Sequence, residues 1–181
     1  MDRVSQTPWC HLRRLVGIVG ITGASGAIYG IRILQTLQGS GIETQLVMSE
    51  SERITLAAES DLGSAEVEAL ASVVHHARNI GATVSSGSFK TTGMVIALCS
   101  IRTLSEIAWG ISSTLVTRAA DVVLKVRRRL VLMLRETPLH AGHLQSMLQP
   151  TNNGAITMPP VPACPCRATA SASWSCAEAR V

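Results

Sequence analysis

The sequence predicts an α/β domain with a three-layer, doubly wound parallel sheet of the Rossmann or flavodoxin type. Short apolar, β-branched runs alternate with amphipathic helical segments, and the connections between them are short. This β-α-β-α order is typical of parallel strands joined by crossover helices. With 181 residues, 46% of them hydrophobic and 15% charged, the chain is long and apolar enough to bury one sizeable core.

Each element follows from its hydrophobic period and its flanking turn residues. In the first half the elements expected are a strand at 15–21, a turn at 22–26, a helix at 27–38, a strand at 44–48, helices at 50–59 and 65–71, and short strand or turn pieces over 73–84. In the second half they are a strand at 94–98, a helix from about 103, a helical run at 112–126, a strand at 130–134, a helix at 140–148 and a short strand at 155–158.

Composition divides the chain into a flexible extension at 1–12, the domain at 13–163 and a tail at 164–181. The tail shows no helical or strand period, and its small residues with Cys, Arg and Trp resemble a GC-rich gene read out of frame. We therefore expect it to be aberrant or disordered. The apolar run after Arg14 is too short for a membrane span, so no membrane association is expected.

Charge and cysteine usage exclude several classes of function. The net charge of +4 is too mild and too scattered for a nucleic-acid-binding protein. Five cysteines form no disulfide or zinc spacing, which favours reduced thiols in a cytoplasmic protein. His140 and His143 lie one turn apart without a third ligand, so no metal site is expected.

The loop after the first strand is the first candidate for a binding site. Gly23, Ala24, Ser25 and Gly26 lie where a parallel strand ends and a helix begins. Unpaired backbone N–H groups and the helix dipole favour an anion there, and the glycines allow its close approach. The alternative is an ordinary strand-to-helix turn, because the loop is neither a dinucleotide-binding nor a Walker motif.

Other predicted strands also end in polar residues. Ser49 ends the second strand, Ser100 follows the strand at 94–98, and Arg135 with Glu136 follows the strand at 130–134. Ligands of open α/β sheets bind outside the carboxyl ends of the strands. Together these residues predict a polar, anion-accepting crevice.

One helical face combines Arg118, Asp121 and Lys125, which are spaced i, i+3 and i+7. This spacing is typical of a surface ion-pair ladder. It also suits two cations that point at a phosphate, with Asp121 holding one of them.

Six motifs, in order over residues 15–163, resemble those of the UbiX-type flavin prenyltransferases. They are GITGASGAIYG at 20–30, SGSFKT at 86–91, MVIALCS at 94–100, RAADVVLK at 118–125, RETPLH at 135–140 and MPPVPA at 158–163. The resemblance implies a homododecamer that binds reduced FMN and dimethylallyl monophosphate without a metal. It also implies transfer of the prenyl group to flavin N5 and C6, and delivery of prenylated FMN to a UbiD-type decarboxylase, for example in ubiquinone synthesis.

The resemblance also implies roles for individual residues. Ser25, Glu59 and Glu136 would take part in catalysis, with Ser25 near flavin N5 and Glu136 exchanging a proton with the prenyl phosphate or orienting it. The residues implied for FMN are Gly23, Ala24, Ser25, Ser49, Ser100, Thr103 and Arg118. Those implied for the prenyl phosphate are Ser86, Gly87, Arg118, Lys125 and Arg135.

The chain departs from the family pattern after Ala163, where an aromatic residue and a long C-terminal helix are usual. Leu98 also replaces a usual Pro, and Trp109, Thr114 and Ala141 are unusual. We therefore hypothesise a truncated or frameshifted copy. The alternatives are an impaired homologue that only binds FMN, and an FMN-dependent decarboxylase of the same fold.

Overall fold

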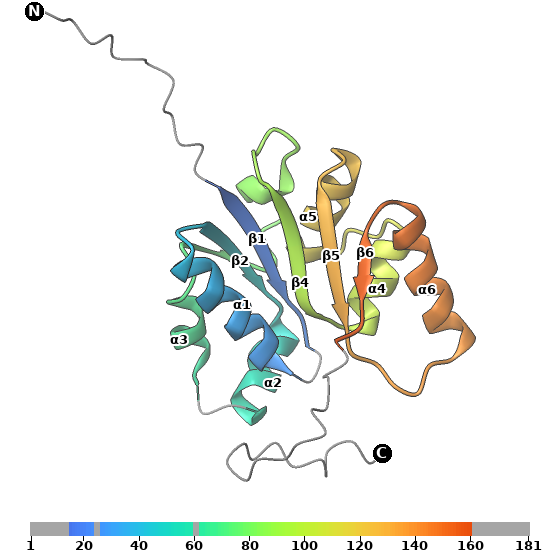
Figure 1. The fold of residues 1–181 in the computed structure, drawn as a ribbon, viewed down its shortest axis with the longest axis horizontal. Helices are drawn as coiled ribbons and strands as arrows, with labels where there is room; N and C mark the ends of the chain where they lie inside the picture. Colours follow the sequence, from blue (N-terminus) through green and yellow to red (C-terminus); the bar gives the residue numbers. More distant parts are fainter. Residues whose placement is uncertain (1–14, 24–25, 60–61, 161–181) are drawn as a thin grey trace, which may run out of the picture.

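The computed structural model describes residues 15–23, 26–59 and 62–160. Six parallel strands form one sheet in the order β3-β2-β1-β4-β5-β6 (Figure 1). The strands are β1 (Val16–Ile21), β2 (Glu43–Met48), β3 (Val73–His76), β4 (Gly93–Cys99), β5 (Arg129–Leu134) and β6 (Ile156–Met158). The helices are α1 (Ala27–Gly39), α2 (Glu50–Glu59), α3 (Ser64–Glu68), α4 (Ile101–Ala108), α5 (Leu115–Lys125) and α6 (Ala141–Asn152), with a short 3-10 turn, η1 (Thr83–Ser85).

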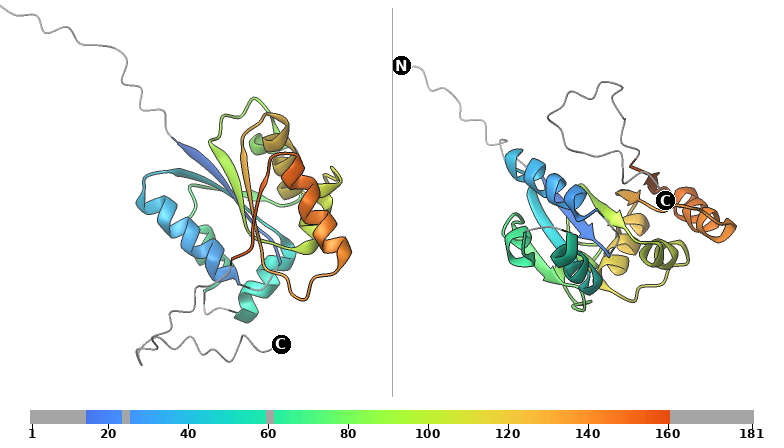
Figure 2. Two further views of the ribbon diagram at one scale, coloured as in Figure 1. Left: turned by 45° about the vertical axis from the view of Figure 1, so that its right-hand side comes forward. Right: turned by 90° about the horizontal axis from the view of Figure 1, so that it is seen from below.

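Both faces of the sheet are covered, which confirms the predicted three-layer fold. On one face the side chains of β1 and β2 pack against α1 and α2 in a core that includes Val19, Leu46, Ile31 and Leu56. On the other face the side chains of β4 and β5 pack against α4 and α5. Figure 2 shows α1 and α6 on opposite sides of the sheet. Burial on both faces explains why the central strands β1 and β4 are apolar throughout.

The strand order reverses next to β1. The chain first moves outward from β1 to β2 and β3, and then returns to place β4 on the other side of β1. The carboxyl ends of β1 and β4 therefore meet at the topological switch point, where open α/β sheets bind ligands.

The predicted elements are present, but several ends differ. The helix expected from about 103 begins at Ile101, because Ser100 caps it and accepts a hydrogen bond from the Thr103 N–H. The last helix continues to Asn152, since its last turn accommodates Pro150. The helix expected at 65–71 covers Ser64–Glu68, and the run expected at 112–126 forms a helix only over Leu115–Lys125, after its cap Thr114.

The extension at 1–12 and the tail at 164–181 lie outside the described residues. Among the helices of the described ranges, none has the length and hydropathy that crossing a membrane requires.

Candidate functional site

Hydrogen bonds of Thr22 join the end of β1 to the end of β4. Its hydroxyl donates to the Leu98 carbonyl over 2.9 Å and accepts the Ser100 N–H over 2.8 Å. Its own N–H also donates to the Leu98 carbonyl, over 3.2 Å. With 2% of its surface exposed, Thr22 makes these bonds away from water. The two strand ends at the switch point are thus held in one fixed arrangement.

The loop after β1 is held on its other side by the start of α2. The Gly23 N–H donates to Ser49 Oγ over 3.2 Å, and Ser49 Oγ lies 3.0 Å from Ser51 Oγ. A Cβ on Gly23 would lie 2.6 Å from Ser51 Oγ, so only glycine fits there. Gly26 has φ 112°, and a Cβ on it would lie 2.7 Å from Leu98 Cδ1. The two glycines are therefore closely packed, Gly23 against α2 and Gly26 against β4.

The start of α4 points to the same edge of the sheet. Ser100 is its N-cap, and Ser100 Oγ donates to Thr103 Oγ1 over 3.0 Å while it accepts the Thr103 N–H over 3.3 Å. The unpaired N–H groups and the positive dipole end of this helix favour an anion at this edge.

Arg135 brings a cation to the loop from the next strand. It follows β5, and its Nη1 lies 3.5 Å from the position of a Cβ on Gly26. Glu136 comes next, and both residues are exposed. Polar residues that follow β1, β2, β4 and β5 thus lie at the same edge of the sheet, the carboxyl edge, as expected from the order of the predicted strands. We call these residues the carboxyl-edge group, which comprises Gly23, Ser49, Ser100, Thr103, Arg135 and Glu136.

A second group of predicted residues lies at the opposite edge. Ser86 and Gly87 precede β4, and a Cβ on Gly87 would lie 3.3 Å from Val126 Cγ1. Lys125 ends α5, just before β5 begins. All strands are parallel, so these three residues lie at the amino edge of the sheet. Together with Arg118 we call them the amino-edge group.

Arg118 lies on α5 between the two edges, two turns and about 10 Å along the helix from Lys125. Its Nη1 is 3.2 Å from Asp121 Oδ2, with 39% and 42% of the two side chains exposed. The predicted ion pair therefore exists. Such an exposed pair is worth at most about 1 kcal/mol, which leaves Arg118 able to turn toward an anion.

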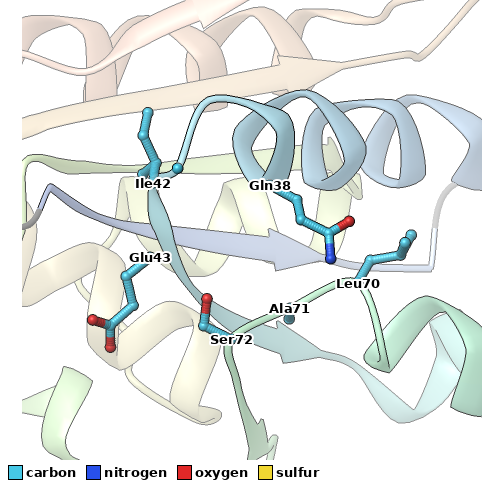
Figure 3. Close-up of a pocket in the computed structure, with 7 residues that line it drawn as sticks. Gln38, Ile42, Glu43, Leu70, Ala71 and Ser72 are labelled. Atoms are coloured by element: carbon cyan, nitrogen blue, oxygen red, sulfur yellow. The ribbon is translucent and has the colours of Figure 1, made fainter.

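Two surface hollows lie away from the carboxyl-edge group. One of about 420 Å³ lies beside Lys125 and Asp121, where the ends of α4, α5 and α6 meet. The other, of about 210 Å³, is lined by Gln38, Glu43 and Ser72 at the start of β2 (Figure 3). The first borders the amino-edge group, and the second contains none of the predicted site residues.

The structure gives little support for a cysteine or histidine acting in catalysis at the site. Burial raises the pKa of Cys99 to about 12, so its thiol stays protonated at neutral pH. Burial also lowers the pKa of His75, whose Nε2 lies 2.7 Å from Gln45 Oε1 on the neighbouring strand. His140 caps α6 through the Gly142 N–H. Within the described ranges, no group of three His, Cys, Asp or Glu residues is placed to hold a metal ion.

Some predictions cannot be placed. Ala24 and Ser25 lie outside the described residues, and Glu59 is placed only as the last residue of α2. Sequence reasoning missed two contacts. They are the hydrogen bonds by which Thr22 joins the ends of β1 and β4, and the packing of Ser51 against Gly23. The signal available for both was a polar residue directly after an apolar strand or at a helix start.

A family model and several known proteins are similar to this chain. The model of the Flavoprotein family matches residues 11–173. Flavin prenyltransferase UbiX of Escherichia coli (strain K12) is 61% identical over 152 residues, which are 83% of this chain and 79% of that protein.

Two solved structures share the fold. AnUbiX in complex with FMN and dimethylallyl pyrophosphate has a TM-score of 0.83 at 48% identity, covering 83% of this chain and 80% of that one. A dodecameric FMN-dependent UbiX-like decarboxylase from Escherichia coli O157:H7 has a TM-score of 0.81 at 45% identity, covering 82% of this chain and 81% of that one.

Proposed function

The chain belongs to the Flavoprotein family and, within it, to the UbiX-type flavin prenyltransferases, and from this premise we propose how its residues act. The reaction joins the dimethylallyl group of dimethylallyl monophosphate to N5 and C6 of reduced FMN. The observation that best supports this function is the carboxyl-edge group, which combines a glycine loop, hydroxyls, helix N-termini and Arg135 at the switch point.

The carboxyl-edge group fits a flavin nucleotide. A Cβ on Gly23 would strike Ser51 and a Cβ on Gly26 would strike Leu98, so both positions require glycine where β1 leads into α1 and the first N–H groups of that helix. Ser49, Ser100 and Thr103 supply hydroxyls, and α4 directs its positive dipole end there. We assign FMN binding to these residues together with Ala24 and Ser25. Reduced flavin supplies the nucleophilic atoms, and the chain has to hold them in place.

The prenyl phosphate needs cations from both groups. An allylic cation forms readily once its phosphate leaves, so neutralising the departing phosphate and orienting the partners are the protein's main tasks. Lys125, Arg118 and Arg135 are suited to bind that phosphate. We assign Glu136 to proton exchange with it and Glu59 to support of the site.

In one chain Ser86, Gly87 and Lys125 lie at the edge opposite the carboxyl-edge group, and Arg118 lies between the two edges, so one copy cannot complete the phosphate site. We propose that Ser86, Gly87, Arg118 and Lys125 of one copy meet the carboxyl-edge group of another. The dodecameric assembly of the 45% identical UbiX-like protein supports an oligomer of this kind. The site is then complete only in the assembly.

The product is prenylated FMN, and we propose a UbiD-type decarboxylase as its recipient and the cytoplasm as its location. The high identity to a protein named as a flavin prenyltransferase makes direct decarboxylation by this chain the weaker alternative.

Incubation of the purified chain with reduced FMN and dimethylallyl monophosphate tests the function. The expected result is a flavin heavier by one dimethylallyl-derived unit, seen by mass spectrometry. Bound FMN that is never prenylated would indicate a homologue that only binds flavin. A parallel reaction with the pyrophosphate tests which phosphate ester is accepted.

A further inference from the structure

Four helices of the described ranges end in the same way, and α5 differs from the other three in one residue. In each, the second residue after the helix has a positive φ, and its N–H and that of the next residue donate to carbonyls near the helix end. After α1, α4 and α6 this residue is Gly41, Gly110 and Gly154, respectively. After α5 it is Arg127, with φ 58°.

An arginine at this position costs stability. The left-handed conformation brings the Cβ of an L residue close to the following carbonyl oxygen, so glycine ordinarily occupies it. Among the described residues, Arg127 is the one non-glycine residue with a positive φ. A cation is favoured at the negative end of a helix dipole, but Lys125 already supplies one in the last turn of α5. The strain at position 127 therefore calls for a function of the arginine side chain.

Arg127 lines the hollow of about 420 Å³ where α4, α5 and α6 end. This volume lies within the range of about 300–1,000 Å³ that is usual for small-molecule sites. Lys125 lines the same hollow, and so do the exposed residues Asn152 and Asn153 at the end of α6. The side-chain amides of asparagine donate hydrogen bonds, so this hollow combines two cations with neutral donors.

The charges around this hollow sum to a positive value. Among the described residues that line it, Asp121 is the one acid, and Arg118 Nη1 lies 3.2 Å from Asp121 Oδ2. Within the same described ranges neither Arg127 nor Lys125 forms an ion pair. Both side chains are cations that donate several hydrogen bonds each, and phosphate oxygens are among their best acceptors. The hollow therefore suits a phosphate monoester.

We infer that Arg127 is a further binding residue for the prenyl phosphate, which it holds together with Lys125. The inference rests on the proposed function, in which Lys125 of one copy meets the carboxyl-edge group of another. A guanidinium donates two parallel hydrogen bonds to a phosphate, which adds a fixed orientation to the charge that a lysine supplies. Binding of this anion explains why α5 ends with a strained arginine where the other three helices have glycine.

The test uses Arg127→Gly, for which stability and binding should change in opposite directions. Loss of the strained conformation should raise the thermal unfolding temperature. Calorimetric titration with dimethylallyl monophosphate should show about tenfold weaker binding, because a charged hydrogen-bond partner of the phosphate is lost. FMN affinity should stay unchanged. Arg129→Gln is the matched control, since it removes an exposed cation two residues away, outside the lining of the hollow, and it should weaken neither ligand.

Two more variants separate charge from backbone conformation. Arg127→Lys keeps the cation and should keep most of the affinity for dimethylallyl monophosphate. Arg127→Asn is neutral but tolerates a positive φ, so it should lose affinity as Arg127→Gly does. Unchanged affinity in both neutral variants would overturn the inference. An equal loss of FMN affinity in them, or a lower unfolding temperature of Arg127→Gly, would also overturn it, because either result assigns Arg127 to the fold alone.

The wild-type chain separates this inference from the proposed function. If it binds dimethylallyl monophosphate but does not prenylate reduced FMN, the proposed function is contradicted, and the affinities of the variants still decide the role of Arg127. If it binds no dimethylallyl monophosphate at all, both the inference and the proposed function are overturned.

Discussion

Thr22 Oγ1 accepts the backbone N–H of Ser100 over 2.8 Å, across the point where the strand order of the sheet reverses. The same hydroxyl donates to the Leu98 carbonyl, so one side chain satisfies a donor and an acceptor of the strand opposite. The positions of the loop after β1 and of the cap of α4 are therefore coupled through a single buried residue.

Replacing this hydroxyl should affect both stability and flavin binding. Thr22→Val keeps the shape but leaves the Ser100 N–H and the Leu98 carbonyl with fewer partners, which should cost about 1–3 kcal/mol of unfolding free energy. FMN affinity should fall as well, because the loop and α4 are no longer coupled. Denaturant unfolding and FMN titration measure the two effects. Thr22→Ser retains the hydroxyl and serves as control, and equal losses in both variants would contradict this role.

The close packing of Gly23 against Ser51 predicts that a second substitution restores part of the FMN binding that a first one removes. In Gly23→Ala the new Cβ would collide with Ser51 Oγ at 2.6 Å and Ser51 Cβ at 2.7 Å, so the loop must move and FMN binding should be lost. The double variant with Ser51→Gly removes both colliding atoms and should recover part of the affinity. Titration with FMN checks this, and absence of any recovery would show that another contact requires glycine at position 23.

Cys99 should be inert in the folded protein. Burial raises its pKa from 9.0 to about 12, so little reactive thiolate exists at neutral or mildly alkaline pH. Alkylation followed by peptide mapping should modify Cys99 only after unfolding. Because the folded pKa is the higher one, the contribution of this thiol to stability is complete below pH 9 and is lost as pH rises toward 12. Cys99→Ala should flatten that alkaline loss, and rapid labelling of Cys99 in the native protein would contradict the burial.

The cap of α4 is expected to serve stability and binding together. Ser100→Ala removes the acceptor of the Thr103 N–H and should cost about 1 kcal/mol of unfolding free energy. It should also weaken FMN binding, whereas Ser113→Ala, which removes an exposed hydroxyl that donates to Glu106 after the same helix, should not. Thermal unfolding with and without FMN separates the two effects, and an equal ligand-induced shift in both variants would contradict a role in binding.

The sequence predicted the order of the elements well because the central strands β1 and β4 are apolar throughout and the longer helices, such as α1 and α5, keep their 3.6-residue period. It also predicted that Ser49, Ser100 and Arg135 would lie at one edge of the sheet, since parallel strands bring their carboxyl ends to the same edge. The predicted helix ends were less accurate. A proline ordinarily marks the end of a helix, but α6 contains Pro150 in its last turn.

The sequence alone could not show that Ser86, Gly87 and Lys125 lie at the edge of the sheet opposite the carboxyl-edge group. The motif at 86–91 and Lys125 were assigned to the phosphate beside Arg135, yet their positions before β4 and at the end of α5 place them at the other edge of the same chain. Nothing in the linear order of the motifs shows which of them lie at different edges of the sheet.

The shared site is tested most directly by mixing two inactive variants. Lys125→Ala damages the amino-edge group and Glu136→Gln the carboxyl-edge group, so each variant alone should make little prenylated FMN. After the two are dissociated together and reassembled in equal amounts, about a quarter of the sites should combine two intact halves. Prenylated FMN, quantified by mass spectrometry, should then return to about a quarter of the wild-type level. A mixture no more active than its separate components would contradict a site built from two copies of the chain.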